Sequence, residues 1–246
     1  METLPKTRGM KRRGVGFYDC SIIAEPVQRS TAAAIASAAF ALQDKNPVML
    51  VMPSDHVIDD AKIFAEAVSF AAGHLPEGAP VILGIRPDAP RDRYGYIRTR
   101  PGENGLSVLE SFIEKPPLKI AKRLCATPGV FWNSGIFLCR ARTLLELLSV
   151  HAPDIFEAAG NAMASAARDG NILRPDSRRY AGIPSLSIDH ALMEKIERAA
   201  VLPLETGWHD VGCWERILAL KLKSFARFPR LSSSYESRRS GSKLPE

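Results

Sequence analysis

Hydrophobic residues along this chain fall into short continuous runs separated by longer segments with a helical period. The runs at 48–52 and 81–85 have no polar alternation, which predicts strands buried on both faces. Residues 62–72 repeat apolar side chains at helical spacing, and residues 32–42 are rich in alanine after Ser30-Thr31, a pair that predicts a capped helix. The same criteria predict strands at 94–97, 108–114 and 200–204, a turn-containing segment at 131–138, and helices at 117–124, 141–149, 153–167 and 187–196.

Strands that alternate with helices predict an α/β fold with a mostly parallel sheet and helices on both faces. The two ends of the chain do not share this alternation. Residues 1–20 show neither period and form an atypical N-terminal segment. Residues 216–246 are basic and too poor in apolar side chains to offset the entropy of ordering, which predicts a disordered tail. We therefore expect one folded domain over residues 21–215.

The composition is that of a soluble globular protein, with 46% hydrophobic and 24% charged residues among 246. No apolar run approaches the roughly 18 residues of a membrane span, and no apolar segment of a secretory signal follows the basic first 20 residues. The cysteines are too widely spaced for a zinc or redox motif, which predicts reduced thiols in a cytoplasmic protein. They are Cys20, Cys125, Cys139 and Cys213.

The net charge of +6 is concentrated in the ends of the chain. Residues 216–246 carry eight Lys or Arg against two Glu, and residues 1–20 carry five against two acids, so the body between them is net negative. A nucleic-acid-binding domain usually carries a basic patch on its folded face. The charge distribution therefore argues against nucleic acid as a partner.

Two acidic residues stand at positions where a ligand is expected to bind. Asp55 comes directly after the strand at 48–52, and ligands of α/β sheets bind outside the carboxyl ends of strands. Asp210 lies between two glycines, in the segment 207–212. Two carboxylates together with phosphate oxygens and water suit Mg²⁺. In the simpler alternative, Asp55 caps a helix and Asp210 is a turn residue.

A second set of polar residues could bind a phosphorylated sugar. Glu114 can accept from two hydroxyls, and the ammonium of Lys115 can hold a phosphate. Asn133 offers both a donor and an acceptor, and Gly95 allows backbone to approach a ligand closely. The alternatives are a solvated Glu-Lys pair, a plain turn at Asn133 and a β-bulge at Gly95.

Taken together, these motifs resemble the bacterial mannose-1-phosphate guanylyltransferases (GDP-mannose pyrophosphorylases), including the guanylyltransferase half of the bifunctional isomerase–guanylyltransferases. The matching segments keep the order of the family and cover roughly residues 21–215. They are Glu-Pro-Val-Gln-Arg-Ser-Thr-Ala at 25–32, Val-Met-Pro-Ser-Asp-His at 51–56, Tyr-Gly-Tyr-Ile at 94–97, Phe-Ile-Glu-Lys-Pro at 112–116, Trp-Asn-Ser-Gly-Ile-Phe at 132–137, Ser-Ile-Asp-His-Ala-Leu-Met-Glu-Lys at 187–195 and Gly-Trp-His-Asp-Val-Gly-Cys-Trp at 207–214.

The resemblance implies a nucleotidyltransferase fold of the Rossmann-like, GT-A-like kind and a role in nucleotide-sugar and polysaccharide biosynthesis. The implied reaction converts GTP and mannose 1-phosphate to GDP-mannose and pyrophosphate. The resemblance assigns Mg²⁺ binding and catalysis to Asp55 and Asp210, and it places the catalytic Lys115 at the sugar phosphate. It assigns the mannose hydroxyls to Glu114 and Asn133 and a backbone contact to Gly95.

The resemblance also places the segment 25–31 beside the nucleotide. Glu25, Arg29 and Thr31 are then expected to bind the nucleotide together with Asp55. Gln28 and Ser30 replace the glycine and asparagine that the family pattern has at these positions.

The main departure from the family concerns its opening strand and glycine-rich phosphate loop. Nothing in residues 1–20 matches this loop or its arginine, and after residue 215 the family pattern gives way to the basic tail. We therefore expect a member shortened at both ends, without the first strand of the sheet. Two other functions stay open, namely an inactive remnant or regulatory subunit that binds sugar nucleotides, and another sugar-nucleotide enzyme such as a glycosyltransferase. The sequence does not predict an oligomeric state.

Overall fold

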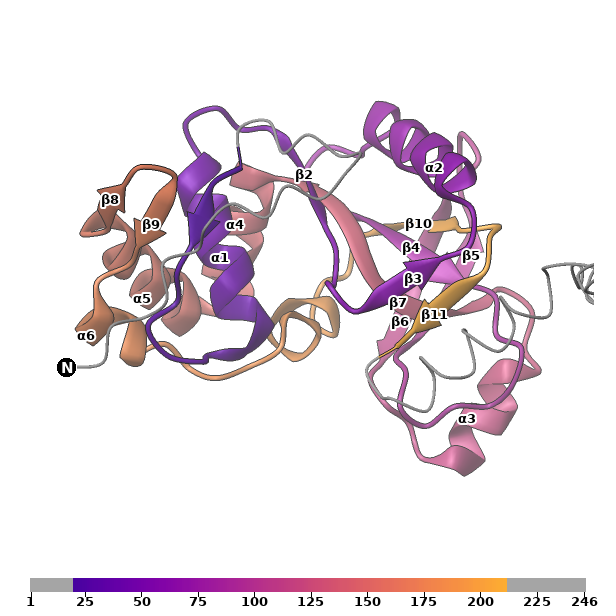
Figure 1. Cartoon of the computed structure of the whole chain (residues 1–246). Helices are drawn as coiled ribbons and strands as arrows, with labels where there is room; N and C mark the ends of the chain where they lie inside the picture. Colours follow the sequence, from indigo (N-terminus) through magenta and orange to yellow (C-terminus); the bar gives the residue numbers. More distant parts are fainter. Residues whose placement is uncertain (1–19, 212–246) are drawn as a thin grey trace, which may run out of the picture.

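The structure is a computed structural model that describes residues 20–211 (Figure 1). The predictions for the N-terminal segment, the basic tail, the phosphate loop, the first strand and Cys213 therefore concern residues outside the described range. A central sheet of six strands organises the described part of the chain. Its spatial order is β2 (Val48–Val51), β7 (Val130–Arg140), β4 (Val81–Ile85), β10 (Ala200–Pro203), β6 (Ser107–Ile113) and β5 (Tyr96–Pro101), and β5 also pairs with β7.

The sheet is mixed, which corrects the prediction of a mostly parallel one. Within it, β10 runs parallel to β4, whereas β2, β4 and β5 all pair antiparallel with β7. β5 and β6 form an antiparallel hairpin, and β6 is also antiparallel to β10. Strand direction depends on which distant segments pair, and hydrophobic runs carry no information about that.

Helices cover both faces of the sheet, as predicted. Helices α1 (Ser30–Leu42), α4 (Ala141–His151) and α5 (Pro153–Ala164) pack in one apolar core, and α2 (Ala61–Gly73) and α3 (Leu118–Cys125) pack in the other. Alternate residues of β4 serve the two cores: Ile82 lies in the first, and Val81 and Leu83 lie in the second. All five residues of β4 are buried, so the prediction of a central strand is confirmed.

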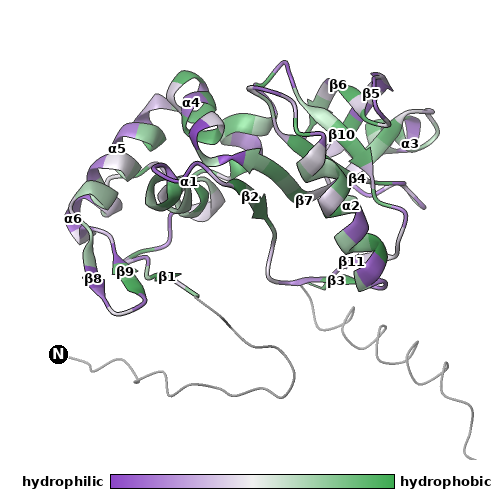
Figure 2. Ribbon diagram, turned by 90° about the horizontal axis from the view of Figure 1, so that it is seen from above, coloured by the Kyte–Doolittle hydropathy of each residue, from purple (hydrophilic) through white to green (hydrophobic). Residues whose placement is uncertain are grey.

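Smaller elements extend the molecule at its two ends. One end holds a three-stranded sheet of β1 (Ile22–Ile23), β9 (Ile172–Arg174) and β8 (Ala167–Asp169), with α6 (Ser177–Ala181) beside it (Figures 1 and 2). The other end holds a ribbon of β3 (His56–Ile58) and β11 (Trp208–Asp210). No helix of residues 20–211 is long and apolar enough to cross a membrane.

Strand β2 forms as predicted, but it is not buried on both faces. Among the described residues it pairs on one side with β7 and lies at the edge of the sheet. Leu50 is 37% exposed and Met52, just beyond the strand, is 44% exposed. Figure 2 shows this hydrophobic strand in green beside β7. The apolar run predicted the strand correctly, but burial depends on partners that a local pattern does not specify.

Helix α1 begins at Ser30, so the two residues expected to cap it lie inside the helix. Its N-cap is Arg29, without a side-chain capping bond, and the prediction that Ser30 and Thr31 cap it was wrong. The Thr31 hydroxyl instead accepts from the Ile188 N–H at 2.8 Å, which ties α1 to a distant segment. Helix α5 ends at Ala164, short of the predicted limit, because residues 167–169 enter β8.

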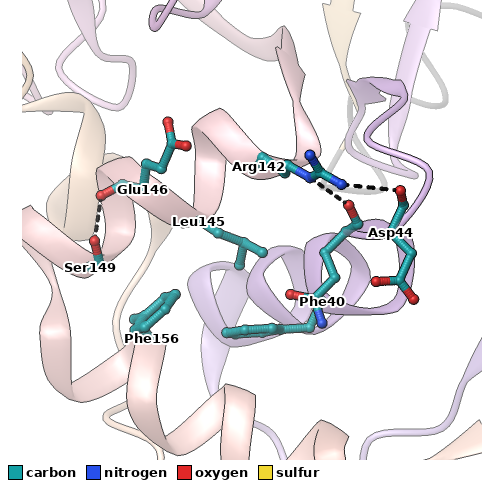
Figure 3. Close-up of a pocket in the computed structure, with 8 residues that line it drawn as sticks. Phe40, Asp44, Arg142, Leu145, Glu146, Ser149 and Phe156 are labelled. Atoms are coloured by element: carbon teal, nitrogen blue, oxygen red, sulfur yellow. Dashed lines mark hydrogen bonds between the residues drawn. The ribbon is translucent and has the colours of Figure 1, made fainter.

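A hollow of about 320 Å³ lies where the end of α1 meets α4 and α5 (Figure 3). The Arg142 guanidinium donates to the carbonyl oxygens of Gln43 and Asp44 at 3.0 and 3.2 Å. These bonds satisfy carbonyls at the end of α1 that have no helical partner. The Phe40 and Phe156 rings line the same hollow, with centroids 5.3 Å apart. We interpret this region as a structural joint between helices.

Candidate active site

The ribbon of β3 and β11 brings the two predicted metal-binding residues together. Asp210 pairs with His56 across the ribbon, and the Val211 N–H donates to the Asp55 carbonyl oxygen at 3.0 Å. Asp55 and Asp210 therefore lie at the same end of the ribbon, on either side of His56. Asp55 caps no helix, because the N-cap of the following helix α2 is Asp60. The alternative of a helix cap was wrong.

Several contacts fix the shape of this ribbon. The Trp208 indole N–H donates to His56 Nδ1 at 3.2 Å, and the two rings meet edge to face at 5.0 Å. Burial lowers the pKa of His56, while the Asp55 and Asp210 carboxylates act in the opposite direction. His209 Nε2 lies 3.3 Å from Asp59 Oδ1. The contacts of Trp208 and His209 thus hold the backbone that leads to Asp210.

An aromatic group connects the ribbon to the central sheet. The Tyr94 ring packs edge to face against Trp208 of β11 at 5.3 Å and against Trp132 of β7 at 5.0 Å. Trp132 directly precedes Asn133. The acidic pair and the predicted sugar-binding residues are therefore joined through packed rings.

Gly95, Glu114 and Asn133 meet where β5, β6 and β7 lie side by side. The Asn133 N–H donates to the Gly95 carbonyl oxygen at 2.8 Å. A Cβ atom on residue 95 would lie 2.6 Å from Glu114 Oε2 and 3.2 Å from Asn133 Cβ. Only a glycine leaves room for this close approach. The structure thus brings these three predicted residues into contact.

Glu114 and Lys115 form an ion pair that is shielded on one side. Lys115 Nζ lies 2.9 Å from Glu114 Oε1, and the Glu114 side chain is 6% exposed whereas that of Lys115 is 61% exposed. The Glu114 carboxylate is therefore not solvated, contrary to the simpler alternative. The hydrogen bond from Lys115 to Glu114 raises the pKa of Lys115, so its ammonium stays charged. Lys115 also has a positive φ of 45°, which turns the chain sharply after Glu114.

Asn133 lies within the continuous strand β7, so the prediction of a turn in 131–138 was wrong. The register between β4 and β7 shifts beside Asn133, and Gly135 has a φ of +71°. The Asn-Ser-Gly sequence thus forms a bulge inside a strand. The Gly135 N–H donates to Asn133 Oδ1 at 3.0 Å, and a Cβ on Gly135 would meet Pro53 Cγ at 3.3 Å. The bulge therefore places Gly135 against Pro53, at the start of the loop that carries Asp55.

Two acidic residues of the site were not singled out from the sequence. Asn133 Nδ2 donates to Asp189 Oδ1 at 2.8 Å, and the Glu114 N–H donates to Glu194 Oε1 at 3.1 Å. Both acids belong to a segment that was predicted as a helix but forms a single π-turn, η1 (Asp189–Met193). The segment 187–195 had been noted as part of the family resemblance, and that was the available signal.

Comparison with known proteins identifies the family. The family model described as nucleotidyl transferase matches residues 7–225. The chain belongs to the nucleotidyl transferase family. The xanthan biosynthesis protein XanB of Xanthomonas campestris pv. campestris (strain B100) is 43% identical over 206 residues, which cover 83% of this chain and 44% of that protein. A mannose-1-phosphate guanylyltransferase of Escherichia coli (strain K12) is 41% identical over 206 residues, which cover 80% of this chain and 43% of that protein.

A solved structure supports the same assignment. The structure titled mannose-1-phosphate geranyltransferase from Thermus thermophilus matches with a TM-score of 0.71 and 36% identity, over 83% of this chain and 58% of that one. The resemblance to mannose-1-phosphate guanylyltransferases and the expected nucleotidyltransferase fold are thus confirmed. This nucleotidyl transferase chain spans less than half the length of the two curated relatives above.

Three of the four residues predicted to bind the nucleotide contact residues 180–188, which lead into η1. The Arg29 guanidinium donates to the Ala181 carbonyl oxygen, and Thr31 holds the backbone at Ile188. Burial, and after it the neighbouring Glu25 carboxylate, raises the pKa of Tyr180. In this nucleotidyl transferase Thr31 therefore holds the backbone next to Asp189, and Arg29 and Glu25 interact with α6. Their contact with a nucleotide stays a prediction.

Proposed function

We propose that this chain is a nucleotidyl transferase of the mannose-1-phosphate guanylyltransferase type, which forms GDP-mannose and pyrophosphate from GTP and mannose 1-phosphate in the cytoplasm. The observation that carries the proposal is the contact of Gly95, Glu114 and Asn133, joined by packed aromatic rings to the ribbon of Asp55 and Asp210. The names of the relatives above support the choice of sugar and nucleotide. Nucleotide-sugar supply for a polysaccharide is the role that follows.

The sugar phosphate would be held by three side chains and one stretch of backbone. The shielded Glu114 carboxylate can accept from sugar hydroxyls, because an ionised acceptor makes strong hydrogen bonds away from water. Asn133 can pair with a further hydroxyl, and the missing side chain of Gly95 leaves backbone accessible. The exposed Lys115 ammonium can hold the phosphate.

The acidic pair fits a divalent cation such as Mg²⁺. Asp55 and Asp210 provide hard oxygen ligands at one end of the ribbon, and both act on the charge of His56 between them. Within residues 20–211 no group of three or more metal-binding side chains gathers, so further ligands would come from phosphate oxygens and water. When bound, Mg²⁺ offsets negative charge on the phosphates.

The chemistry needs positioning more than covalent participation by the protein. An oxygen of mannose 1-phosphate forms a bond to the α-phosphorus of GTP, and the bond from that phosphorus to the pyrophosphate oxygen breaks. Lys115 would hold the attacking phosphate in line, and Glu114 and Asn133 would fix the sugar behind it. We assign Glu25, Arg29 and Thr31 to the nucleotide side, with Asp55 between the two substrates.

Binding of sugar nucleotides without any turnover is a second candidate function. The observation that favours it is that residues 1–20 contain no match to a glycine-rich phosphate loop with its arginine. Losing one preorganised donor commonly costs on the order of 10²–10³ in rate. We therefore expect residues 1–246 to bind GDP-mannose and to turn over below the ordinary range of roughly 1–10³ per second.

Pyrophosphate release and GDP-mannose formation from GTP, mannose 1-phosphate and Mg²⁺ test this proposal, alongside GDP-mannose binding by calorimetry. Slow product formation supports guanylyltransferase chemistry at this site. Binding without any GDP-mannose formed selects the second candidate. A chain that neither binds GDP-mannose nor forms it contradicts the proposed function.

A further inference from the structure

The π-turn η1 aligns two acidic residues that an α-helix would separate. Its backbone bond runs from the Glu194 N–H to the Asp189 carbonyl oxygen at 2.9 Å. Residues five apart are thereby stacked, whereas an α-helix stacks residues three and four apart. The Ser187 hydroxyl accepts from the His190 N–H at 3.3 Å and fixes where the turn starts. One short segment can therefore present two carboxylates to the same side of the site.

Each of these carboxylates holds a different residue of the sugar-phosphate site. Asp189 Oδ1 accepts from the Asn133 side chain at 2.8 Å. Glu194 Oε1 accepts from the Glu114 N–H at 3.1 Å, and its Oε2 lies 3.7 Å from His190 Nδ1. The acids thus reach Asn133 within β7 and Glu114 directly after β6.

The contact with Asp189 determines which way the Asn133 amide faces. Its Oδ1 already accepts from the Gly135 N–H at 3.0 Å, and its Nδ2 donates to Asp189. A flipped amide would lose both bonds. One Nδ2 hydrogen and one Oδ1 lone pair remain for a ligand hydroxyl, in a fixed arrangement.

This arrangement brings like charges together. Burial, and after it the charge of Glu114, raises the pKa of Asp189, while the hydrogen bond from Asn133 and the charge of Lys115 act in the opposite direction. The close approach of the Asp189 and Glu114 carboxylates, shielded from water, lowers the stability of the fold. Arrangements that cost stability concentrate at functional sites.

We propose that Asp189 and Glu194 are positioning residues for the sugar. Asp189 fixes the direction of the Asn133 amide, and Glu194 fixes the backbone from which the Glu114 side chain projects. The inference rests on the proposed function, because it takes the mannose of GDP-mannose as the group these residues help to select. GDP lacks the sugar, so its affinity should not depend on Asp189 or Glu194.

Calorimetric titrations with GDP-mannose and with GDP, both with Mg²⁺, test this proposal. Asp189→Ala is expected to weaken GDP-mannose binding by about 5- to 150-fold, since it removes the acceptor of Asn133 Nδ2, and to change GDP binding by less than about twofold. Asp189→Asn keeps an acceptor and should recover most of the affinity. Glu194→Ala should act in the same direction, and the exposed Glu197→Ala should leave both ligands unaffected.

A double-mutant cycle tests the route of the effect. In an Asn133→Ala background, Asp189→Ala should weaken GDP-mannose binding by less than about twofold more, because its partner is gone. A full additional loss there, or an equal loss for GDP and GDP-mannose in the single variant, overturns the positioning role. Failure of the unaltered chain to bind GDP-mannose overturns the proposed function itself, and the positioning role with it. Circular dichroism and thermal melting identify any variant that does not fold.

Discussion

Replacing Gly95 with alanine perturbs the site by a single methyl group. The new Cβ would lie 2.6 Å from Glu114 Oε2, where an ordinary contact is 3.4–4 Å. The carboxylate cannot move away freely, because Glu114 Oε1 is held by Lys115 at 2.9 Å and the side chain is 6% exposed. Asn133 Cβ and Phe112 Cζ, each 3.2 Å from the added atom, close the other directions.

The expected costs for stability, activity and binding follow from this geometry. Crowding a packed position by a methyl group typically costs about 1–3 kcal/mol of stability. The carboxylate must shift by roughly 0.8 Å to restore an ordinary contact, and a misplacement of about 1 Å can cost on the order of 10²-fold in activity. We expect Gly95→Ala to weaken GDP-mannose binding by about 5- to 150-fold, corresponding to about 1–3 kcal/mol of lost hydrogen bonding.

Calorimetric titration with GDP-mannose and thermal melting measure the two effects together. Gly73→Ala is a matched control, since Gly73 lies at the end of α2 with nothing within 4 Å of an added Cβ. That control should bind normally and melt at the same temperature or slightly higher, because alanine favours helix. If Gly95→Ala binds GDP-mannose as tightly as the unaltered chain and melts at the same temperature, the contact between Gly95 and Glu114 does not shape the site.

Three further predictions concern the metal, the acids and the helix joint. Asp210→Asn should weaken Mg²⁺-dependent binding of GDP-mannose by about 10- to 150-fold, the usual cost of losing a charged partner, and a chelator should abolish the difference between this variant and the unaltered chain. Because the folded-state pKa of Asp189 is raised above its ordinary 3.8, stability should fall as pH rises through that window, and urea titrations should show Asp189→Asn gaining stability over the unaltered chain at pH 7 relative to pH 4. Arg142→Met should lower the free energy of unfolding by about 0.5–1.5 kcal/mol, because it removes the exposed bonds to the Gln43 and Asp44 carbonyls, and should leave GDP-mannose binding unchanged. An unchanged urea midpoint for Arg142→Met would remove the structural role assigned to that joint.

The elements that the sequence predicted well are those whose signal is local. The apolar run at 81–85 coincides with β4, and the helical period at 62–72 gives α2 within one residue at each end. Burial of both faces was right for β4 but wrong for β2, although the two runs look alike. The difference lies in the number of strands that pair with each, which is a property of the whole sheet.

Two features of the site depend on contacts between distant segments and could not be predicted from local patterns. Asn-Ser-Gly is typical of a turn, yet β7 continues through it because pairing with β4 and β5 compensates for the bulge at Gly135. The helical pattern at 187–196 gave no sign of a π-turn, since residue spacing of five has no common sequence signature. Asp189 and Glu194 were therefore missed as neighbours of Asn133 and Glu114.

Residue chemistry suggested Gly95, Glu114 and Asn133 as sugar-binding candidates, the family resemblance gave each a role, and the structure brings these residues into contact. Their roles toward a ligand stay predictions. Neither the hydrophobic pattern nor the family resemblance predicted the directions of the strands in the mixed sheet. Long-range pairing thus decides the features that the sequence left open.

Recognition of mannose by the shielded Glu114 carboxylate is tested most directly by calorimetric titration of GDP-mannose, with Mg²⁺, into the unaltered chain and Glu114→Ala. Glu110→Ala serves as the control, because Glu110 is an exposed acid on β6, the strand that ends directly before Glu114. We predict measurable binding to the unaltered chain and to the control, and a loss of about 5- to 150-fold for Glu114→Ala. Equal affinity of the unaltered chain and Glu114→Ala, or no binding by the unaltered chain, would contradict the recognition of mannose by Glu114.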